Sequence, residues 1–334
     1  MDVNNLTEIF GNGNPNRKEI TNRQYALRLS KLAERFEDTT GEFLNDPPPI
    51  YEYLQGRPAN TQSNVVSSIV EYLNSTNADP KLVAEYKNRK SVIADAIAEN
   101  YSKNSFSPSQ QENFVSGEEF NDYVNKVSEH FKGLDPIVHK GYYEELRNVR
   151  LLLHLYKNYP SRNEYANLKF ITLREYKKFK TNEMLNYIII RSGKNPLLSV
   201  GKYKTDKTYG LKQTEITDPL TKKLVKDHLT TRGYNYLFTL TKDPSKVWEP
   251  HNLATILTKW SLNFINKRIS STMIYKIVIN ELGLEYKKLL DEGKITEASK
   301  LKAILNEHAR IRGHQDTTQL QIYVKKSTED PKME

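Results

Sequence analysis

Apolar residues recur at helical spacing along most of this chain, and one region carries the pattern of β-strands. Before residue 180 no alternating strand pattern appears, whereas apolar side chains repeat every three to four positions. Residues 185–191 are instead a short β-branched run, and residues 197–205 and 211–217 flank a turn that ends in Gly210. Such a pair of runs predicts a β-hairpin. The expected fold class is therefore α+β, mainly α with a small antiparallel β-sheet.

Shifts in composition divide the chain into two domains. Residues 1–18 contain Gly, Pro and several Asn and predict a flexible leader. Residues 19–110 predict a bundle of about four helices. The polar stretch 101–117 is typical of a linker. Residues 111–326 are expected to form the second domain, and a short tail follows at 327–334.

The composition excludes several classes of protein. The chain has 334 residues and no cysteine, so disulfides, thiolate metal sites and cysteine nucleophiles are excluded. Its seven histidines show no HExxH-like spacing, so a metal centre built on histidine is not expected. No run of eighteen apolar residues exists, so no membrane span is expected. The first ten residues lack the basic and apolar regions of a secretory signal, which favours an intracellular protein.

Basic residues concentrate in the second domain. Residues 1–110 hold 12 Lys and Arg against 14 Asp and Glu. The chain totals are 50 and 41, which leaves 38 against 27, or a net charge of +11, for residues 111–334. A basic half of this size favours a polyanionic partner such as nucleic acid. The alternative is that the charge only keeps the protein in solution.

The segment 308–323, HARIRGHQDTTQLQIY, predicts the end of a helix followed by reactive side chains. Gly313 and His314 close the helix, and Tyr323 follows nine residues after the histidine. A phenol is a weak nucleophile at neutral pH because its unperturbed pKa is about 10. It therefore needs neighbours that orient it and stabilise the developing charge. The alternative is a helix-end histidine after a glycine cap and a half-buried tyrosine.

This segment resembles the C-terminal box of the tyrosine recombinases, the phage-type integrase family. There a Gly-His pair, a short linker and a Thr-Thr pair precede the nucleophilic tyrosine. Arg162 with Glu164 and Leu168 resembles the first arginine box of the same family, although Tyr-Pro-Ser stands where the family usually has glycine before the arginine. We expect Arg162 two residues into a helix; the alternative is a surface arginine paired with Glu164.

The predicted hairpin matches the place where the family carries its catalytic lysine, near a turn of a three-stranded sheet. Four lysines lie on it: Lys202, Lys204, Lys207 and Lys212. The resemblance favours Lys204 first and Lys207 second. The alternative is a lysine-rich hairpin tip that is merely solvated.

The second arginine box departs from the family pattern. Aligned with it, the family's histidine falls on Thr272, its arginine on Tyr275 and the following base on Lys276. The family's two arginines hold the non-bridging oxygens of the scissile phosphate by bidentate hydrogen bonds. Lys276 or Arg268 are candidates to compensate in part, without the fork geometry of a second guanidinium.

The resemblance implies a site-specific DNA recombinase or integrase that cleaves and rejoins strands through a 3′-phosphotyrosine intermediate. The first domain then corresponds to the core-binding DNA-binding domain and the second to the catalytic domain. No cofactor is implied. The partners are double-stranded DNA and three further copies of the chain in a tetramer on DNA. The charged insertion at 287–307 resembles recombinases of large DNA viruses and mobile elements, which would act in the host cytoplasm or nucleus. The candidate catalytic residues are Arg162, Lys204, Lys207, Lys276, His314 and Tyr323.

Two other interpretations remain open. The chain could be a degenerate relative that binds DNA with little or no cleavage, which Tyr275 in place of arginine favours. It could also be an unrelated helical nucleic-acid-binding protein. A type IB topoisomerase shares the cleavage chemistry and differs in acting as a monomer.

Overall fold

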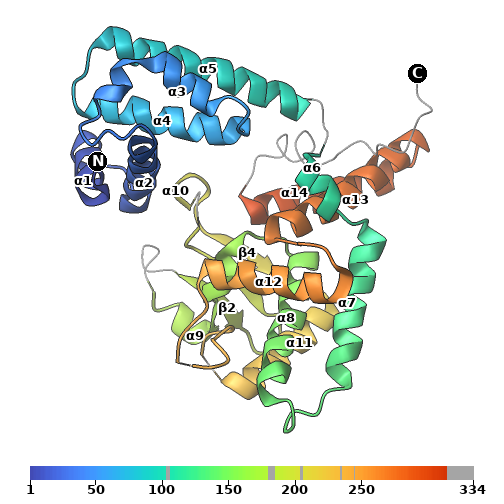
Figure 1. The fold of residues 1–334 in the computed structure, drawn as a ribbon. Coiled ribbons are helices and arrows are strands. Elements are labelled where there is room, and N and C mark those ends of the chain that lie inside the picture. The colour runs from blue at the N-terminus through green and yellow to red at the C-terminus, as the bar shows by residue number, and fades with distance from the viewer. Residues whose placement is uncertain (103–105, 180–184, 204–205, 234, 244, 314–334) are drawn as a thin grey trace. The chain divides into compact units, whose positions relative to one another are not determined.

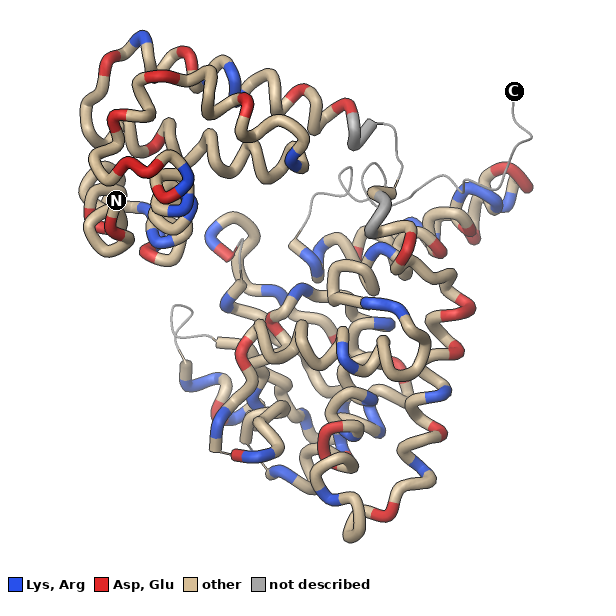
Figure 2. The backbone as a smooth tube through the Cα atoms, in the orientation of Figure 1, with Lys and Arg blue, Asp and Glu red and all other residues tan. Residues whose placement is uncertain are grey.

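The computed structural model describes residues 1–102, 106–179, 185–203, 206–233, 235–243 and 245–313 (Figure 1). The chain forms two compact units, residues 1–103 and 104–334. Each unit has its own hydrophobic core. The second unit carries the excess of Lys and Arg, and blue and red segments are interspersed along its helices (Figure 2).

The first unit is entirely helical in its described part. Its elements are α1 (Val3–Gly13), α2 (Glu19–Arg35), the 3₁₀ helix η1 (Glu42–Asn45), α3 (Pro47–Leu54), α4 (Ala59–Ser75) and α5 (Pro80–Ser102). Apolar faces of these helices meet in one core, as the periodicity predicts. Pro47 occupies the first helical position of α3, where its missing N–H costs nothing.

The predicted flexible leader is wrong for α1. Asp2 caps this helix by accepting from the backbone N–H groups of Asn4 and Asn5. Leu6 and Phe10, one turn apart, are buried in the core of the first unit. The glycine content misled the prediction, since Gly13 lies where α1 approaches α4 so closely that a Cβ would collide with Ser75.

The second unit packs helices around a small sheet. Its elements are α6 (Pro108–Asn113), α7 (Gly117–Lys132), α8 (Lys140–Asn158), the 3₁₀ helix η2 (Asn163–Asn167), β1 (Lys169–Thr172), α9 (Leu173–Tyr176), β2 (Asn186–Ile190), β3 (Leu197–Val200), α10 (Asp206–Tyr209), β4 (Lys212–Glu215), α11 (Pro219–Arg232), α12 (Pro250–Ile265), α13 (Ser271–Asp291) and α14 (Ile295–Arg312). α8 runs through its core, with Leu151, Leu152, Leu153 and Leu155 all fully buried.

The α+β class is confirmed, and the sheet is mixed rather than antiparallel. Its strand order is β1-β2-β3-β4. The predicted hairpin is formed by β3 and β4, in which Val200 pairs with Lys212. β1 pairs with β2 in parallel, Lys169 opposite Tyr187. The expectation of no strand before residue 180 is therefore wrong, because a four-residue strand has too few positions for its alternation to be recognised.

Two further helices set up the C-terminal part of the second unit. α13 begins at the N-cap Ser270, whose hydroxyl accepts from the backbone N–H of Met273. It continues without a break into the predicted insertion and ends at Asp291. α14 then returns to pack against α13 and against β4, and ends at Arg312. The next residue, Gly313, has the left-handed φ of 72° that is typical of a glycine cap.

Candidate active site

A polar cavity of about 530 Å³ opens in the second unit where the segment after α8 meets the N-termini of α12 and α13. Two arginines, Arg162 and Arg312, contribute to its wall although 150 residues separate them in the chain. Among the described residues, the lining is formed by Arg162, Asn163, Glu164, Asn167, Asn186, Lys202, Tyr203, Pro250, Ser271, Thr272 and Arg312.

Arg162 is held in the cavity wall by its backbone. It is the residue before η2 rather than the second residue of an α-helix as expected. Its carbonyl oxygen accepts a 2.6 Å hydrogen bond from the Tyr156 hydroxyl, and Tyr156 is buried in the core. The side chain is partly buried, and among the described residues its Nη1 atom has no hydrogen-bond partner. A buried guanidinium nitrogen in this state is suited to donate to an anionic ligand.

The neighbours of Arg162 are fixed by side-chain hydrogen bonds to two other helices. Asn163 accepts a 2.6 Å bond from Ser271 Oγ at the start of α13 and donates to the carbonyl of Pro250 at the start of α12. The carboxylate of Glu164 accepts from Ser161 Oγ at 2.8 Å, so it does not serve as the surface partner of Arg162 that the alternative interpretation expected.

Asn186 ties the sheet to this segment. Its side chain is buried, and its Nδ2 atom donates to Asn167 Oδ1 at 3.0 Å and to the carbonyl of Lys202 at 3.1 Å. Its Oδ1 atom accepts from the backbone N–H groups of Gly201 and Lys202. One amide therefore fixes the exit of β3 against the cavity.

Arg312 is the functional candidate that the sequence analysis missed. It is the last residue of α14 and is 4% exposed. Its Nη1 atom donates to the carbonyl of Ser161, the residue directly before Arg162, and its Nη2 atom donates to Thr272 Oγ1 at 3.1 Å. Its guanidinium carbon lies 4.7 Å from the centroid of the buried Tyr275 ring. A basic residue in the last turn of a helix is common, so the sequence alone gave no reason to single it out.

Lys212, at the start of β4, is a buried amine beside the cavity. Its Nζ atom donates to the carbonyl of Ile311 at 3.2 Å and lies 3.3 Å from the centroid of the Tyr203 ring. Burial, opposed by Glu164 and assisted by nearby arginines including Arg162, lowers the pKa of Lys212 to about 8. An amine with a pKa this close to neutrality can give up its proton in a reaction.

β4 also holds the last turn of α14 in place. Arg310 Nη2 donates to the carbonyl of Gln213 at 2.9 Å and to Thr214 Oγ1 at 2.7 Å. Thr214 in turn donates to Glu307 at 2.8 Å. These bonds, with that of Lys212, fix the helix end from which Arg312 reaches the cavity.

The structure brings one of the six candidate residues, Arg162, to the cavity. Lys207 lies exposed on α10. Lys276 is buried on α13, where its Nζ atom lies 6.0 Å from the centroid of the Phe106 ring, and it is not among the lining residues. Lys204, His314 and Tyr323 lie outside the described residues.

The positions around the second arginine box separate along α13. Thr272 lines the cavity, and Tyr275, one turn later, lies beneath the Arg312 guanidinium. Lys276, one turn after Thr272, is buried near the Phe106 ring and does not line the cavity. Arg268, the other residue considered as compensation, is exposed and precedes the helix.

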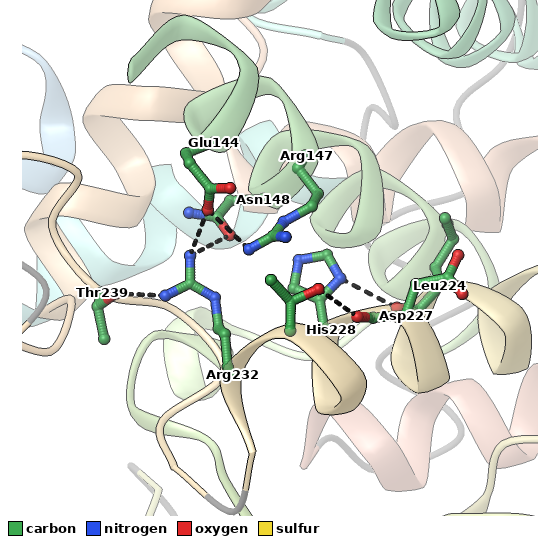
Figure 3. Close-up of polar contacts among 9 residues, drawn as sticks. Glu144, Arg147, Asn148, Leu224, Asp227, His228, Arg232 and Thr239 are labelled. Carbon is green, nitrogen blue, oxygen red and sulfur yellow. Dashed lines mark hydrogen bonds and ion pairs between the residues drawn. The ribbon is translucent and has the colours of Figure 1, made fainter. Parts of the chain in front are cut away.

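A second polar cluster joins α8 to α11 (Figure 3). Arg232 donates to Thr239 Oγ1 at 2.6 Å, to Asn148 at 3.2 Å and to Glu144 at 3.4 Å, and Glu144 also binds Arg147 at 2.7 Å. These contacts link three segments of the second unit. Since the single carboxylate serves two guanidinium groups, we interpret the cluster as structural.

Comparisons with known proteins identify no family. No protein-family model and no curated protein matches the chain. The crystal structure of XerA recombinase aligns with 98% of this chain and 95% of its own, with a TM-score of 0.39 and 11% sequence identity. Similarity at that level establishes neither a shared fold nor a shared function.

Two properties of the described residues bear on the kind of site. Among them, no group of three or more His, Asp or Glu side chains is arranged to hold a metal ion. No helix in the same part of the chain is long and apolar enough to cross a membrane.

Proposed function

We propose that the second unit binds a DNA phosphodiester in the 530 Å³ cavity and acts as a tyrosine recombinase, cleaving and rejoining the strand. The observation that carries this proposal is the pair of arginines, Arg162 and Arg312, in one cavity wall with a buried amine beside them. Guanidinium groups match the geometry of phosphate oxygens better than any other side chain. The net charge of +11 on this unit supports a polyanionic substrate.

The proposed reaction is a transesterification. The Tyr323 hydroxyl oxygen attacks the phosphorus, the bond from phosphorus to the 5′ oxygen breaks, and a 3′-phosphotyrosine and a free 5′-hydroxyl result. His314 is the candidate base for the phenol proton, and a lysine donates a proton to the leaving oxygen. The 5′-hydroxyl of a partner strand reverses the step. Bond energy is conserved, so the reaction requires no cofactor.

Lys212 is our first choice for the proton donor. Its lowered pKa, about 8, places proton release near neutral pH, and its position beside Arg162 keeps it close to the phosphate. Lys204 and Lys207 remain the candidates that the sequence gives for this role, and Lys276 remains a candidate to compensate for the absent second arginine. Lys207 lies on an exposed element, which makes its position less suited to this role.

A DNA-binding protein without cleavage is the second candidate function. It is favoured by Tyr275, which stands where the family has its second arginine and is fully buried. In that case the cavity would bind phosphate and Tyr323 would not react.

We further propose that the chain works as a homotetramer on two duplexes, with the first unit supplying additional DNA contacts, in the integration of a viral or mobile element. Analytical ultracentrifugation of the protein with a duplex of roughly four helical turns tests the assembly. Two bound duplexes per four chains are expected, and one chain per duplex at all concentrations would contradict it.

The test of cleavage is covalent trapping. The full chain is incubated with a pool of nicked duplexes of random sequence at low salt, and adducts are separated on a denaturing gel. A wild-type adduct that is absent with Tyr323→Phe is expected. Binding that weakens steeply with salt, with no adduct from either protein, would support the non-cleaving function. Absence of binding at low salt would overturn both.

A further inference from the structure

We propose that Arg312 supplies the second guanidinium of the phosphate site, and that the ring of Tyr275 is its support. The inference rests on the proposed function in one respect: the ligand is taken to be a phosphodiester. The arginine that is absent from position 275 of α13 is then replaced by one that reaches the same place from the end of α14.

Three contacts fix the position of the Arg312 side chain. Its two terminal nitrogens donate to the carbonyl of Ser161 and to Thr272 Oγ1. Its guanidinium carbon lies over the Tyr275 ring, 4.7 Å from the centroid. Two hydrogen bonds and one aromatic contact leave a long side chain little rotational freedom. An ordered, buried guanidinium is what phosphate recognition requires.

The same contacts place the two arginines together. Arg312 binds the carbonyl of Ser161, and the next residue is Arg162. The two arginine side chains line the same cavity.

The charge balance of the cavity favours an anion. Arg162, Arg312 and Lys202 line it, and in the part of the chain that the structure describes Glu164 is the one acidic lining residue. Its carboxylate is already engaged by Ser161 Oγ. Partly desolvated cations in excess of anions are stabilised when an anionic ligand enters.

The tyrosine at position 275 is explained by the same arrangement. Arginine stacks readily on an aromatic face. An arginine at position 275 would instead bring a second cation to within a few ångströms of the Arg312 guanidinium, which is unfavourable in a buried place. Tyr275→Arg alone should therefore lower activity rather than raise it. Combined with Arg312→Ala, it should recover part of the activity that Arg312→Ala loses.

The experiment measures the rate of adduct formation on the nicked-duplex pool for Arg312→Gln, Arg312→Lys, Arg312→Ala, Tyr275→Arg and the double variant Tyr275→Arg/Arg312→Ala. Lys302→Gln, an exposed change on the same helix, is the control for lost charge. We expect a fall of at least about 100-fold for Arg312→Gln and at least about tenfold for Arg312→Lys, which keeps the charge and loses the fork. Lys302→Gln should change the rate less than about twofold. A fall of less than about threefold in the rate for both Arg312→Gln and Arg312→Lys would overturn the inference. If Tyr323→Phe still forms no adduct in that case, the proposed function stands although the inference fails.

A second measurement decides the inference if wild type gives no adduct. Inorganic phosphate is titrated against sodium chloride at matched ionic strength, and the melting temperature of the second unit is followed by tryptophan fluorescence. Phosphate should stabilise wild type and Lys302→Gln more than it stabilises Arg312→Gln, Arg312→Lys or Arg162→Gln. Equal stabilisation of wild type and both Arg312 variants would overturn the inference. Circular dichroism tests whether each variant is folded. If Arg312→Gln does not fold, Arg312→Lys alone tests the inference.

Discussion

Acidification from pH 7 to pH 5 is expected to destabilise the second unit through three buried histidines. His154, His228 and His308 are each less than a tenth exposed. Burial lowers the pKa of His154 and His308 to about 4 and that of His228 to about 3. Positive neighbours contribute to this, chiefly Arg150 for His154 and Arg147 for His228. All three are therefore neutral in the folded protein at pH 5.

The sign and size of the effect follow from proton linkage. An unfolded histidine, with a pKa of about 6.5, binds a proton as the pH falls below that value. In the folded protein, His154 and His308 bind a proton only near pH 4 and His228 only near pH 3. Acid therefore favours the unfolded state, and the stability present above about pH 6.5 is lost between that value and about pH 4 for His154 and His308, and down to about pH 3 for His228. Between pH 7 and pH 5, each histidine lowers the unfolding free energy by about 2 kcal/mol, and the three together lower it by about 6 kcal/mol. That is comparable to the whole stability of a typical domain.

The assay is urea unfolding at pH 7 and pH 5, followed by tryptophan fluorescence. The two tryptophans of the chain, Trp248 and Trp260, are both buried in the second unit, so the signal reports this unit alone. His154→Leu should reduce the loss between the two pH values by about 2 kcal/mol, whatever its effect at pH 7. His251→Gln, at an exposed position, should leave the loss unchanged. A difference in the unfolding free energy of wild type between pH 7 and pH 5 below about 1 kcal/mol would refute the reasoning, because protonation of the histidines would then not stabilise the unfolded state over the folded one.

Three substitutions test the packing around the site. Glu144→Ala should lower the unfolding free energy by about 3 kcal/mol, because Arg147 and Arg232 lose their shared carboxylate. An unchanged midpoint of urea unfolding would contradict this. Asn186→Ala should lower the unfolding free energy of the second unit by about 3 kcal/mol, because it leaves buried backbone groups without hydrogen-bond partners. Amide hydrogen exchange at the exit of β3 should become faster, while exchange in the first unit stays the same. Gly313→Ala should lower the unfolding free energy by about 1 kcal/mol, because alanine is strained at a φ of 72°. Gly313→Asn should be tolerated better, since asparagine adopts the left-handed conformation more readily. Equal melting temperatures for the two variants would rule out backbone strain as the cause.

Local signals in the sequence were sufficient for most of the helices and for the hairpin. Ser116 and Glu119, three residues apart just before an apolar-periodic segment, have the spacing of a capping box, and both reciprocal hydrogen bonds are present. Trp260 is in the core, as its place in an amphipathic helix predicts. These features depend on residues a few positions apart, so a sequence pattern can carry them.

Features that depend on tertiary contacts could not be predicted in the same way. β1 is too short to show a period, and its pairing with β2 is decided by packing. Arg312 is brought to the cavity because α14 packs back against α13 and β4, which sets it beside Ser161 and Tyr275. Lys212 was one of four lysines on the predicted hairpin, and its burial distinguishes it.

Both edges of the small sheet are closed by the chain itself. Along β1, the backbone N–H of Phe170 donates to the carbonyl of Asn235 at 2.9 Å, so an irregular segment occupies that side. Along β4, the carbonyl of Gln213 is occupied by Arg310 from α14. An open strand edge is a template for pairing with another chain and hence for aggregation. The concentrated protein should therefore resist β-type self-association, and truncation within α14 should expose the β4 edge and lower its solubility.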